Sequence, residues 1–307
     1  MFEVPVPHGL RRFGESVRAS ALGDPANPPV VVLGGISADC FPGVRPDGSL
    51  GWWWGLVGEE CAVDPARFCV IGMDFAADET GGTAPSTADQ AAILEAVLDA
   101  VQVRRRVSLV GASYGAMVAM ALAEASPGRV DRLVVVSAGA SPHPASTAAR
   151  ELQRRVVSLG LLAGRGSEAL AIARGMAMLT YRTPEEFQVR FDGGIAEDAT
   201  LSSSEPGAYL RARGHAFRSV MSPGRFLSLS ASIDRHRVNP ERVTAPCLLI
   251  GAESDQIVFP DQMRRLTDGI GGGAELHLLD SLFGHDMFLK EAPRIGELIG
   301  PFLGSPE

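Results

Sequence analysis

A serine, an acid and a histidine stand where this sequence could build a nucleophilic site. Ser113 lies within GASYG, residues 111–115, a G-x-S-x-G pattern that follows an apolar run and precedes a helical one. Such a pattern places the serine on a sharp strand-to-helix turn, where small neighbours are needed because the backbone is crowded. The start of the helix also favours negative charge that develops near the hydroxyl. We therefore interpret Ser113 as a nucleophile and not as part of a structural glycine turn.

A serine hydroxyl is a weak nucleophile, so it needs a histidine base that is itself held by an acid. Where a serine occupies this kind of turn, the chain order is serine, acid, histidine. Asp255 follows the apolar run CLLIGAE and His285 follows the next run, ELHLLD. Both would lie in loops at the same sheet edge as Ser113, which predicts a triad of these three residues. Glu253 is the alternative acid, whereas the other five histidines fit this context less well.

Acyl chemistry at Ser113 also requires donors for a developing oxyanion. We expect one from the amide of Tyr114, directly after the nucleophile, and one from the loop LGGISAD after the first apolar run. Two glycines let that loop approach closely, and the amide of Ile36 is its most suitable donor.

These residues must be positioned by a sheet, and the hydrophobic pattern predicts one. Short apolar runs cover residues 29–35, 68–75, 106–113, 132–138, 247–253 and 275–280. Their near-continuous hydrophobicity is typical of strands buried on both faces of a parallel sheet. Helical patterns lie between the runs, and one of them begins at an N-cap candidate, Ser86 or Thr87. Strand–helix alternation of this kind predicts an α/β fold with a mostly parallel sheet.

The stretch from residue 141 to residue 244 interrupts this alternation, because it contains several helical patterns and no convincing buried strand. We predict that residues 1–140 and 245–307 form the α/β core and that residues 141–244 form an inserted helical cap. Such a cap would cover the carboxyl edge of the sheet, where open α/β sheets bind ligands.

Composition argues against several classes of protein. The net charge of −8 does not suit nucleic acid as the main partner, because phosphate binding needs a basic face. No segment approaches the length of a membrane span, and the first residues lack the apolar region of a signal peptide. The four cysteines show no CxxC pair and no metal-ligand spacing with histidine. We expect free thiols, no metal, no membrane partner and a cytoplasmic location.

Longer motifs of this chain resemble the MetX-like homoserine O-acyltransferases of the α/β-hydrolase superfamily. The resemblance runs in order from the double-tryptophan segment, residues 51–75, through the serine turn to residues 169–191 and the motif GHDMFL at 284–289. It implies an α/β-hydrolase fold with a helical cap, and it makes His285 the base of the triad. It also implies that Asp286 binds the α-amino group of an amino-acid substrate, that Arg174 meets its carboxylate and that Tyr181 lines the same pocket.

The residue types agree with that assignment, because a zwitterion needs one fixed cation and one fixed anion, and arginine suits a carboxylate. The competing interpretations are a solvated helix residue for Arg174 and a helix N-terminal acid for Asp286.

The resemblance implies a CoA-dependent O-acyltransferase of methionine biosynthesis, which moves an acetyl or succinyl group from acyl-CoA to the hydroxyl of L-homoserine through a serine acyl-enzyme. Acyl-CoA would be a co-substrate, with no tightly bound cofactor. A homodimer is an option, since dimers are common in the resembling family. Both acyl groups, and L-serine as acceptor, stay open.

Two other classes of function compete. An esterase or thioesterase fits the triad equally well, but it leaves Arg174, Tyr181 and Asp286 unexplained. A hydrolase-fold binding protein with a decayed site is the non-enzymatic alternative, and the intact triad argues against it.

Overall fold

A single eight-stranded sheet forms the centre of the computed structural model, which describes residues 1–191 and 204–304. The strands are β1 (Phe2–Pro5), β2 (Ser16–Leu22), β3 (Pro29–Leu33), β4 (Cys69–Met73), β5 (Val107–Ala112), β6 (Val130–Val136), β7 (Cys247–Ala252) and β8 (Ala274–Leu279). Their order is β1-β2-β4-β3-β5-β6-β7-β8. Strands β3 to β8 pair in parallel, while β2 pairs antiparallel with both β1 and β4. The predicted α/β fold with a mostly parallel sheet is confirmed.

Each face of the sheet packs against its own layer, which explains the continuous apolar runs. Along β5, Leu109 belongs to the apolar cluster that contains side chains of α1 (Thr87–Ala100), α2 (Tyr114–Ala125) and α8 (Pro260–Gly269). The next residue, Val110, belongs to the opposite cluster, with α9 (Met287–Lys290), α10 (Ala292–Gly304) and a segment around Trp53. Successive strand residues point to opposite faces, so both faces demand apolar side chains.

Helix α1 illustrates how local sequence sets an element boundary. Its N-cap is Ser86, the first of the two residues expected there. The Ser86 hydroxyl accepts the amide hydrogen of Asp89, and the Asp89 carboxylate accepts that of Ser86. This reciprocal pair satisfies amides that the first helical turn leaves unpaired.

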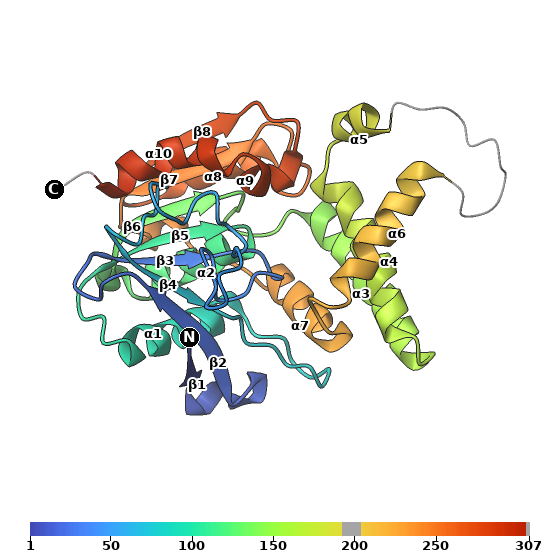
Figure 1. The fold of residues 1–307 in the computed structure, drawn as a ribbon, viewed down its shortest axis with the longest axis horizontal. Coiled ribbons are helices and arrows are strands. Elements are labelled where there is room, and N and C mark those ends of the chain that lie inside the picture. Colours follow the sequence, from blue (N-terminus) through green and yellow to red (C-terminus); the bar gives the residue numbers. More distant parts are fainter. Residues whose placement is uncertain (192–203, 305–307) are drawn as a thin grey trace.

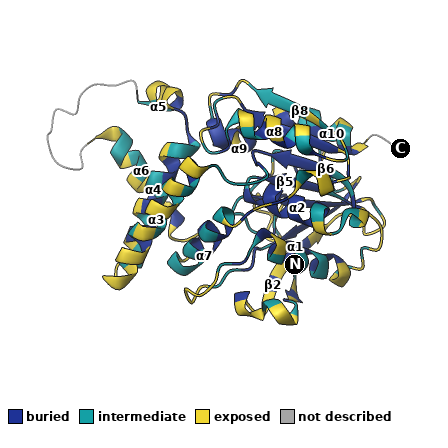
Figure 2. Cartoon of the chain, turned by 180° about the vertical axis from the view of Figure 1, so that it is seen from behind, coloured by how far each residue is buried: buried dark blue, intermediate teal, exposed yellow. Residues whose placement is uncertain are grey.

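Within the described residues, five α-helices are inserted between β6 and β7. They are α3 (Pro144–Leu162), α4 (Gly166–Tyr181), α5 (Pro184–Arg190), α6 (Glu205–Phe217) and α7 (Pro223–Asp234). Helices α3, α4 and α6 pack side by side beyond the sheet, and α7 lies between them and the core (Figure 1). Residues 192–203, which belong to the predicted cap, lie outside the described residues. The bounds of the cap as a separate domain, residues 141–244, stay a prediction. In Figure 2 the strands are mostly buried, whereas α3, α4 and α6 carry many exposed residues.

The two N-terminal strands are the part of the sheet that the hydrophobic pattern did not predict. In β1 and β2 buried and exposed residues are mixed, so neither gives a continuous apolar run. The six predicted strands are all present as β3 to β8.

All four cysteines are free thiols. None of the helices in the described residues is long and apolar enough to cross a membrane.

Candidate active site

Ser113 stands on a strained turn between β5 and α2. Its backbone has φ 53° and ψ −118°, a conformation with positive φ that residues other than glycine rarely adopt. The Ser113 amide donates to the carbonyl of Val136 at 2.8 Å, which fixes the turn to β6. A Cβ atom on Gly115 would lie 2.3 Å from the carbonyl oxygen of Leu33, so no larger residue fits there without a shift of the backbone. The G-x-S-x-G pattern is therefore set by close packing around the serine.

The three predicted triad residues are in contact. The Nε2 atom of His285 lies 2.9 Å from the hydroxyl of Ser113, and its Nδ1 lies 2.8 Å from Oδ2 of Asp255. A carboxylate only accepts, so Nδ1–H donates to Asp255 and leaves Nε2 free to accept the serine proton. The other Asp255 oxygen accepts the amides of Ile257 and Val258 at 2.8 and 3.0 Å. The acid is thus held rigidly, and through it the ring of the histidine.

The charges around His285 stabilise the protonated form of its imidazole ring. Burial by itself lowers the pKa of His285, but the charge and hydrogen bond of Asp255 and the charge of Asp286 outweigh that effect. The pKa of His285 is consequently raised above its ordinary value of 6.5. A buried carboxylate beside the ring stabilises the imidazolium that forms when a serine is deprotonated.

Glu253, the alternative acid, does not take part in this contact. It lies at the end of β7, exposed to solvent, and pairs with Arg264 at 3.2 Å. Asp255, two residues later, is the carboxylate that reaches His285.

The two amides expected to hold an oxyanion lie in suitable places. The Gly115 amide donates to the Gly34 carbonyl at 2.8 Å, which keeps the loop after β3 against the start of α2. Ile36 in that loop lines the cavity beside Ser113. Tyr114 is the first residue of α2, and amides in a first helical turn have no partner within the helix. Their role stays a prediction.

The side chain of Tyr114 serves packing. Its ring meets Phe75 edge to face at 4.7 Å between centroids, and its hydroxyl bonds to that of Ser232 at 2.6 Å. Burial raises its pKa to about 12, so the phenol stays neutral.

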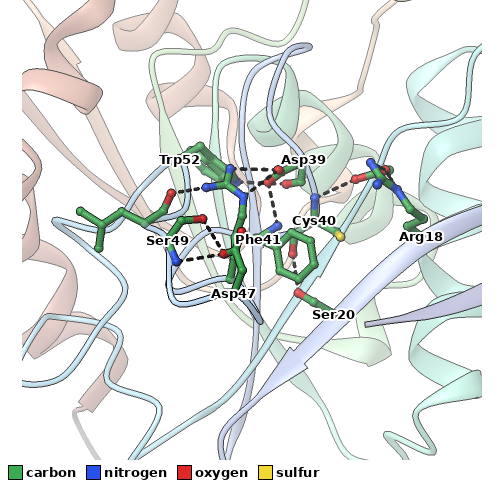
Figure 3. Close-up of polar contacts among 11 residues, drawn as sticks. Arg18, Ser20, Asp39, Cys40, Phe41, Asp47, Ser49 and Trp52 are labelled. Carbon is green, nitrogen blue, oxygen red and sulfur yellow. Dashed lines mark hydrogen bonds and ion pairs between the residues drawn. The ribbon is translucent and has the colours of Figure 1, made fainter. Parts of the chain in front are cut away.

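The loop after β3 is fixed by a polar cluster at its centre (Figure 3). The indole nitrogen of Trp52 donates to the carbonyl of Asp39 at 3.1 Å. The amide of Cys40 donates to Asp74 at 2.7 Å, and Arg18 pairs with the same carboxylate at 2.7 Å. These contacts tie the part of the loop that follows Ile36 to β2 and to the residue after β4.

A cavity of about 370 Å³ opens beside Ser113 and contains the predicted substrate residues. Arg174, Tyr181 and Asp286 all line it. The guanidinium of Arg174 lies over the rings of Tyr181 and Phe217, 5.2 and 4.7 Å from their centroids. It forms no ion pair within the described parts of the chain, which leaves it available to an anion. The ring of Tyr181 lies 5.8 Å from that of His285.

Asp286 has a partner that the sequence did not indicate. Its Oδ2 lies 3.6 Å from Nε of Arg182, a buried arginine that also pairs with Glu186. Asp286 precedes α9, but its side chain makes no capping hydrogen bond there. The interpretation of Asp286 as a simple helix N-terminal acid is therefore not supported.

Helix α3 supplies cavity residues that sequence reasoning missed. Ser146, Ala149, Arg150 and Gln153 all line the cavity. Their spacing of three, four and seven residues places them on one helix face. The sequence signal for these residues is a row of small and polar side chains along one face of an amphipathic helix. Such a row looks like an ordinary solvated face unless the position of the helix over the cavity is known. Within the described residues, no group of three or more His, Cys, Asp or Glu side chains could hold a metal ion.

Comparisons with known proteins agree with this geometry. Residues 28–292 match the family described as alpha/beta hydrolase fold. A homoserine O-succinyltransferase of Xanthomonas campestris pv. campestris is 39% identical over 305 residues, which cover 97% of this chain and 81% of the relative. The solved homoserine O-acetyltransferase of Bacillus anthracis has a TM-score of 0.84 at 15% identity, with 94% of this chain and 92% of that chain covered. A solved esterase also has a TM-score of 0.84, at 20% identity and 98% coverage of both chains. At such identities these structures are similar in fold alone.

Proposed function

Because this chain belongs to the alpha/beta hydrolase fold family, and within it to the group that includes homoserine O-succinyltransferase, we propose that it is a CoA-dependent O-acyltransferase acting on the hydroxyl of L-homoserine. One observation carries the proposal. A serine–histidine–aspartate set opens into the same cavity as an available guanidinium, Arg174, and a carboxylate, Asp286. Those two charges suit the carboxylate and ammonium of an amino acid, which a simple ester does not carry.

In the first half-reaction Ser113 attacks the thioester carbonyl of acyl-CoA. His285 accepts the hydroxyl proton through Nε2, while Asp255 stabilises the imidazolium through Nδ1. The amides of Tyr114 and Ile36 hold the oxyanion. The thioester bond breaks, an ester to Ser113 forms, and CoA leaves as the thiol with the proton from His285.

In the second half-reaction the amino acid binds with its carboxylate on Arg174 and its ammonium on Asp286, beside Tyr181. His285 takes the proton of the substrate hydroxyl, whose oxygen attacks the acyl-enzyme. Collapse of this second tetrahedral intermediate releases the O-acyl amino acid and returns the proton to Ser113. Methionine biosynthesis is the pathway that we propose for this product.

An acyltransferase must keep water from its acyl-enzyme, and the insertion between β6 and β7 is suited to that task. Helices α3 and α4 supply Ala149, Gln153 and Thr180 to the cavity wall. An esterase or thioesterase remains the second candidate, since a solved esterase has the same overall fold. In that case the charged pair beside the triad would have no function.

The test is release of CoA thiol from acetyl-CoA and from succinyl-CoA, each with and without L-homoserine, and with L-serine as a second acceptor. We expect release that depends on the amino acid, an O-acyl product identified by mass, and no turnover by Ser113→Ala. Release indifferent to both amino acids would establish the hydrolase instead.

We also propose a cytoplasmic location, supported by the four free thiols. A homodimer stays a prediction, which sedimentation of the purified protein would test.

A further inference from the structure

The loop that carries the proposed oxyanion donor Ile36 contains no helix or strand, so its shape depends on what packs against it. We call residues 34–39 the oxyanion loop. A turn closes its middle, since the amide of Ala38 donates to the carbonyl of Gly35 at 2.9 Å. The amide of Ile36 makes no hydrogen bond within residues 1–191 and 204–304, which leaves it available to an oxyanion. Such a donor must be held accurately, because a misplacement of about 1 Å can cost roughly 100-fold in rate.

The side chain of Trp52 contacts both ends of the oxyanion loop. Its indole nitrogen donates to the carbonyl of Asp39, the last residue of the loop, at 3.1 Å (Figure 3). Its ring covers Gly34, the first residue, where a Cβ atom would lie 2.9 Å from two carbons of that ring. Tryptophan is a large side chain with only two rotatable bonds, so it is a rigid support. The two residues that flank the donor amide are therefore fixed by one side chain.

The backbone of the tryptophan segment is joined to the residues that follow the oxyanion loop. The amides of Trp52 and Trp53 donate to the carbonyls of Phe41 and Pro42 at 3.2 and 2.9 Å. The carboxylate of Asp39 accepts the amide of Phe41 at 3.0 Å. The position of Trp52 relative to the loop is thus set by main-chain bonds as well as by its own ring.

Trp53 extends this contact to the catalytic base. It is 1% exposed, and its ring stacks on that of Trp52 with 5.0 Å between centroids. Its indole nitrogen donates to the carbonyl of Phe288 at 2.7 Å, and the two rings meet edge to face at 6.0 Å. The ring of Phe288 in turn meets the imidazole of His285 edge to face at 5.9 Å. A continuous row of aromatic rings therefore runs from the oxyanion loop to His285.

The sheet alone does not bring these two parts of the site together. The oxyanion loop follows β3 and His285 follows β8, and strands β5, β6 and β7 lie between them. Yet the oxyanion and the proton transfer belong to the same tetrahedral intermediate, in both half-reactions. The loop amide and the imidazole must consequently keep one fixed separation.

From this arrangement we propose that Trp52 and Trp53 are positioning residues, which hold the oxyanion loop and His285 in a fixed relation so that both act on one intermediate. The inference rests on the serine acyl-enzyme chemistry proposed above, and it holds for any acyl donor or acceptor. It adds no step to the reaction. The residues that support the reacting groups are themselves locked by packing and hydrogen bonds, as a preorganised site requires.

The experiment uses two reactions of the intact protein. One is cleavage of p-nitrophenyl acetate, an ester with neither CoA nor an amino acid, and the other is CoA release from acetyl-CoA or succinyl-CoA with L-homoserine. In Trp52→Leu we expect kcat to fall by roughly 10- to 100-fold in both reactions, by the same factor, because the oxyanion donor is displaced. The KM for L-homoserine should stay within about twofold of the wild type.

More conservative variants separate the contacts and guard against a failure to fold. Trp52→Phe keeps a ring over Gly34 without the bond to Asp39, and it should show an intermediate loss. Trp53→Phe keeps the stacking without the bond to Phe288, and it should also lower kcat in both reactions. If the two tryptophans act through one row, the double variant Trp52→Phe/Trp53→Phe should lose less than the product of the two single losses.

Trp54→Leu is the matched control. It removes the same type of side chain from the next position of the same segment, but Trp54 is 60% exposed. Both reactions should stay within about twofold of the wild type, and circular dichroism should show the same fold in all variants.

Three outcomes would overturn the inference. Wild-type cleavage of p-nitrophenyl acetate by Trp52→Leu, with a raised KM for acyl-CoA, would make Trp52 a wall that touches the donor. Equal losses in Trp52→Leu and Trp54→Leu would reflect general damage to the segment. Losses that multiply in the double variant would mean that the two rings act separately. By contrast, the expected losses with p-nitrophenyl acetate, together with CoA release indifferent to amino acids, would reject the transferase and support this inference.

Discussion

Nε of Arg182 lies 3.6 Å from the carboxylate of Asp286, in a region where the side chain of Arg182 is only 5% exposed. The same guanidinium pairs with Glu186, which also pairs with Arg190 at 3.3 Å, so two cations and two carboxylates form one cluster. Asp286 is the carboxylate of this cluster that lines the cavity, where it would meet an ammonium group that enters.

Removal of Arg182 should destabilise the fold more than most substitutions. Arg182→Met would leave Glu186 and Asp286 without their common cation, and an uncompensated buried charge costs about 3 to 5 kcal/mol. The free energy of unfolding, measured with urea, should fall by that amount. Arg190→Met is the control, because Arg190 pairs with Glu186 at 3.3 Å but is 42% exposed. Its loss should be below about 1 kcal/mol, and similar losses in both variants would contradict the argument.

Arg174 gives a prediction about the acceptor half-reaction. In Arg174→Met the KM for L-homoserine should rise by roughly 10- to 100-fold, because a charge-assisted hydrogen bond to its carboxylate is lost. The burst of CoA release that precedes acceptor binding should change much less. Arg165→Met, at the exposed start of the same helix, should leave both quantities close to the wild type. A burst lost together with acceptor binding would move Arg174 to the donor side.

The pH dependence of the first half-reaction should follow the pKa of His285. This histidine must be neutral to accept the Ser113 proton, and its pKa is raised because the effects of Asp255 and Asp286 exceed that of burial. Activity should therefore fall on the acidic side, through a pKa above the ordinary value of 6.5. Asp255→Asn removes the largest raising influence, so the acidic limb should move to lower pH while the rate drops.

The control for that prediction is Glu253→Gln. Glu253 is exposed and paired with Arg264, whereas the carboxylate bonded to His285 is that of Asp255. Its pH profile should match that of the wild type. An acidic limb that shifts with Glu253→Gln and not with Asp255→Asn would make Glu253 the acid that governs the base.

Much of this site could be predicted from the sequence because its residues follow strands. Ser113, Asp255 and His285 lie in the segments that follow β5, β7 and β8, and parallel strands deliver such residues to one sheet edge. Arg150 and Arg182 could not be predicted in this way. Arg150 projects from α3 and Arg182 directly follows α4. Their directions depend on how these helices pack on the core, and local pattern carries no information on that packing. Strands β1 and β2 were missed because buried and exposed residues are mixed in both, so neither forms a continuous apolar run.

His236 is a buried histidine outside the triad, and it makes a prediction about stability. Its Nδ1 lies 2.8 Å from the hydroxyl of Thr87, and its Nε2 lies 3.2 Å from the carbonyl of Gly139. The carbonyl only accepts, so Nε2 carries the hydrogen and Nδ1 accepts from Thr87. Burial lowers the pKa of His236 to about 4, and the neutral ring therefore joins α1 to the end of β6.

Because the pKa of His236 is lower in the folded chain than its ordinary 6.5, the unfolded chain binds the extra proton first on acidification. The stability from the neutral ring is complete above the ordinary pKa and is lost as pH falls towards 4. The shift corresponds to about 3 kcal/mol. Between about pH 7 and pH 4.5 the wild type should lose roughly 2 to 3 kcal/mol more unfolding free energy than His236→Gln, which cannot titrate. Parallel losses in the two proteins would mean that His236 is protonated in the folded state, and that the Gly139 and Thr87 contacts do not depend on a neutral ring.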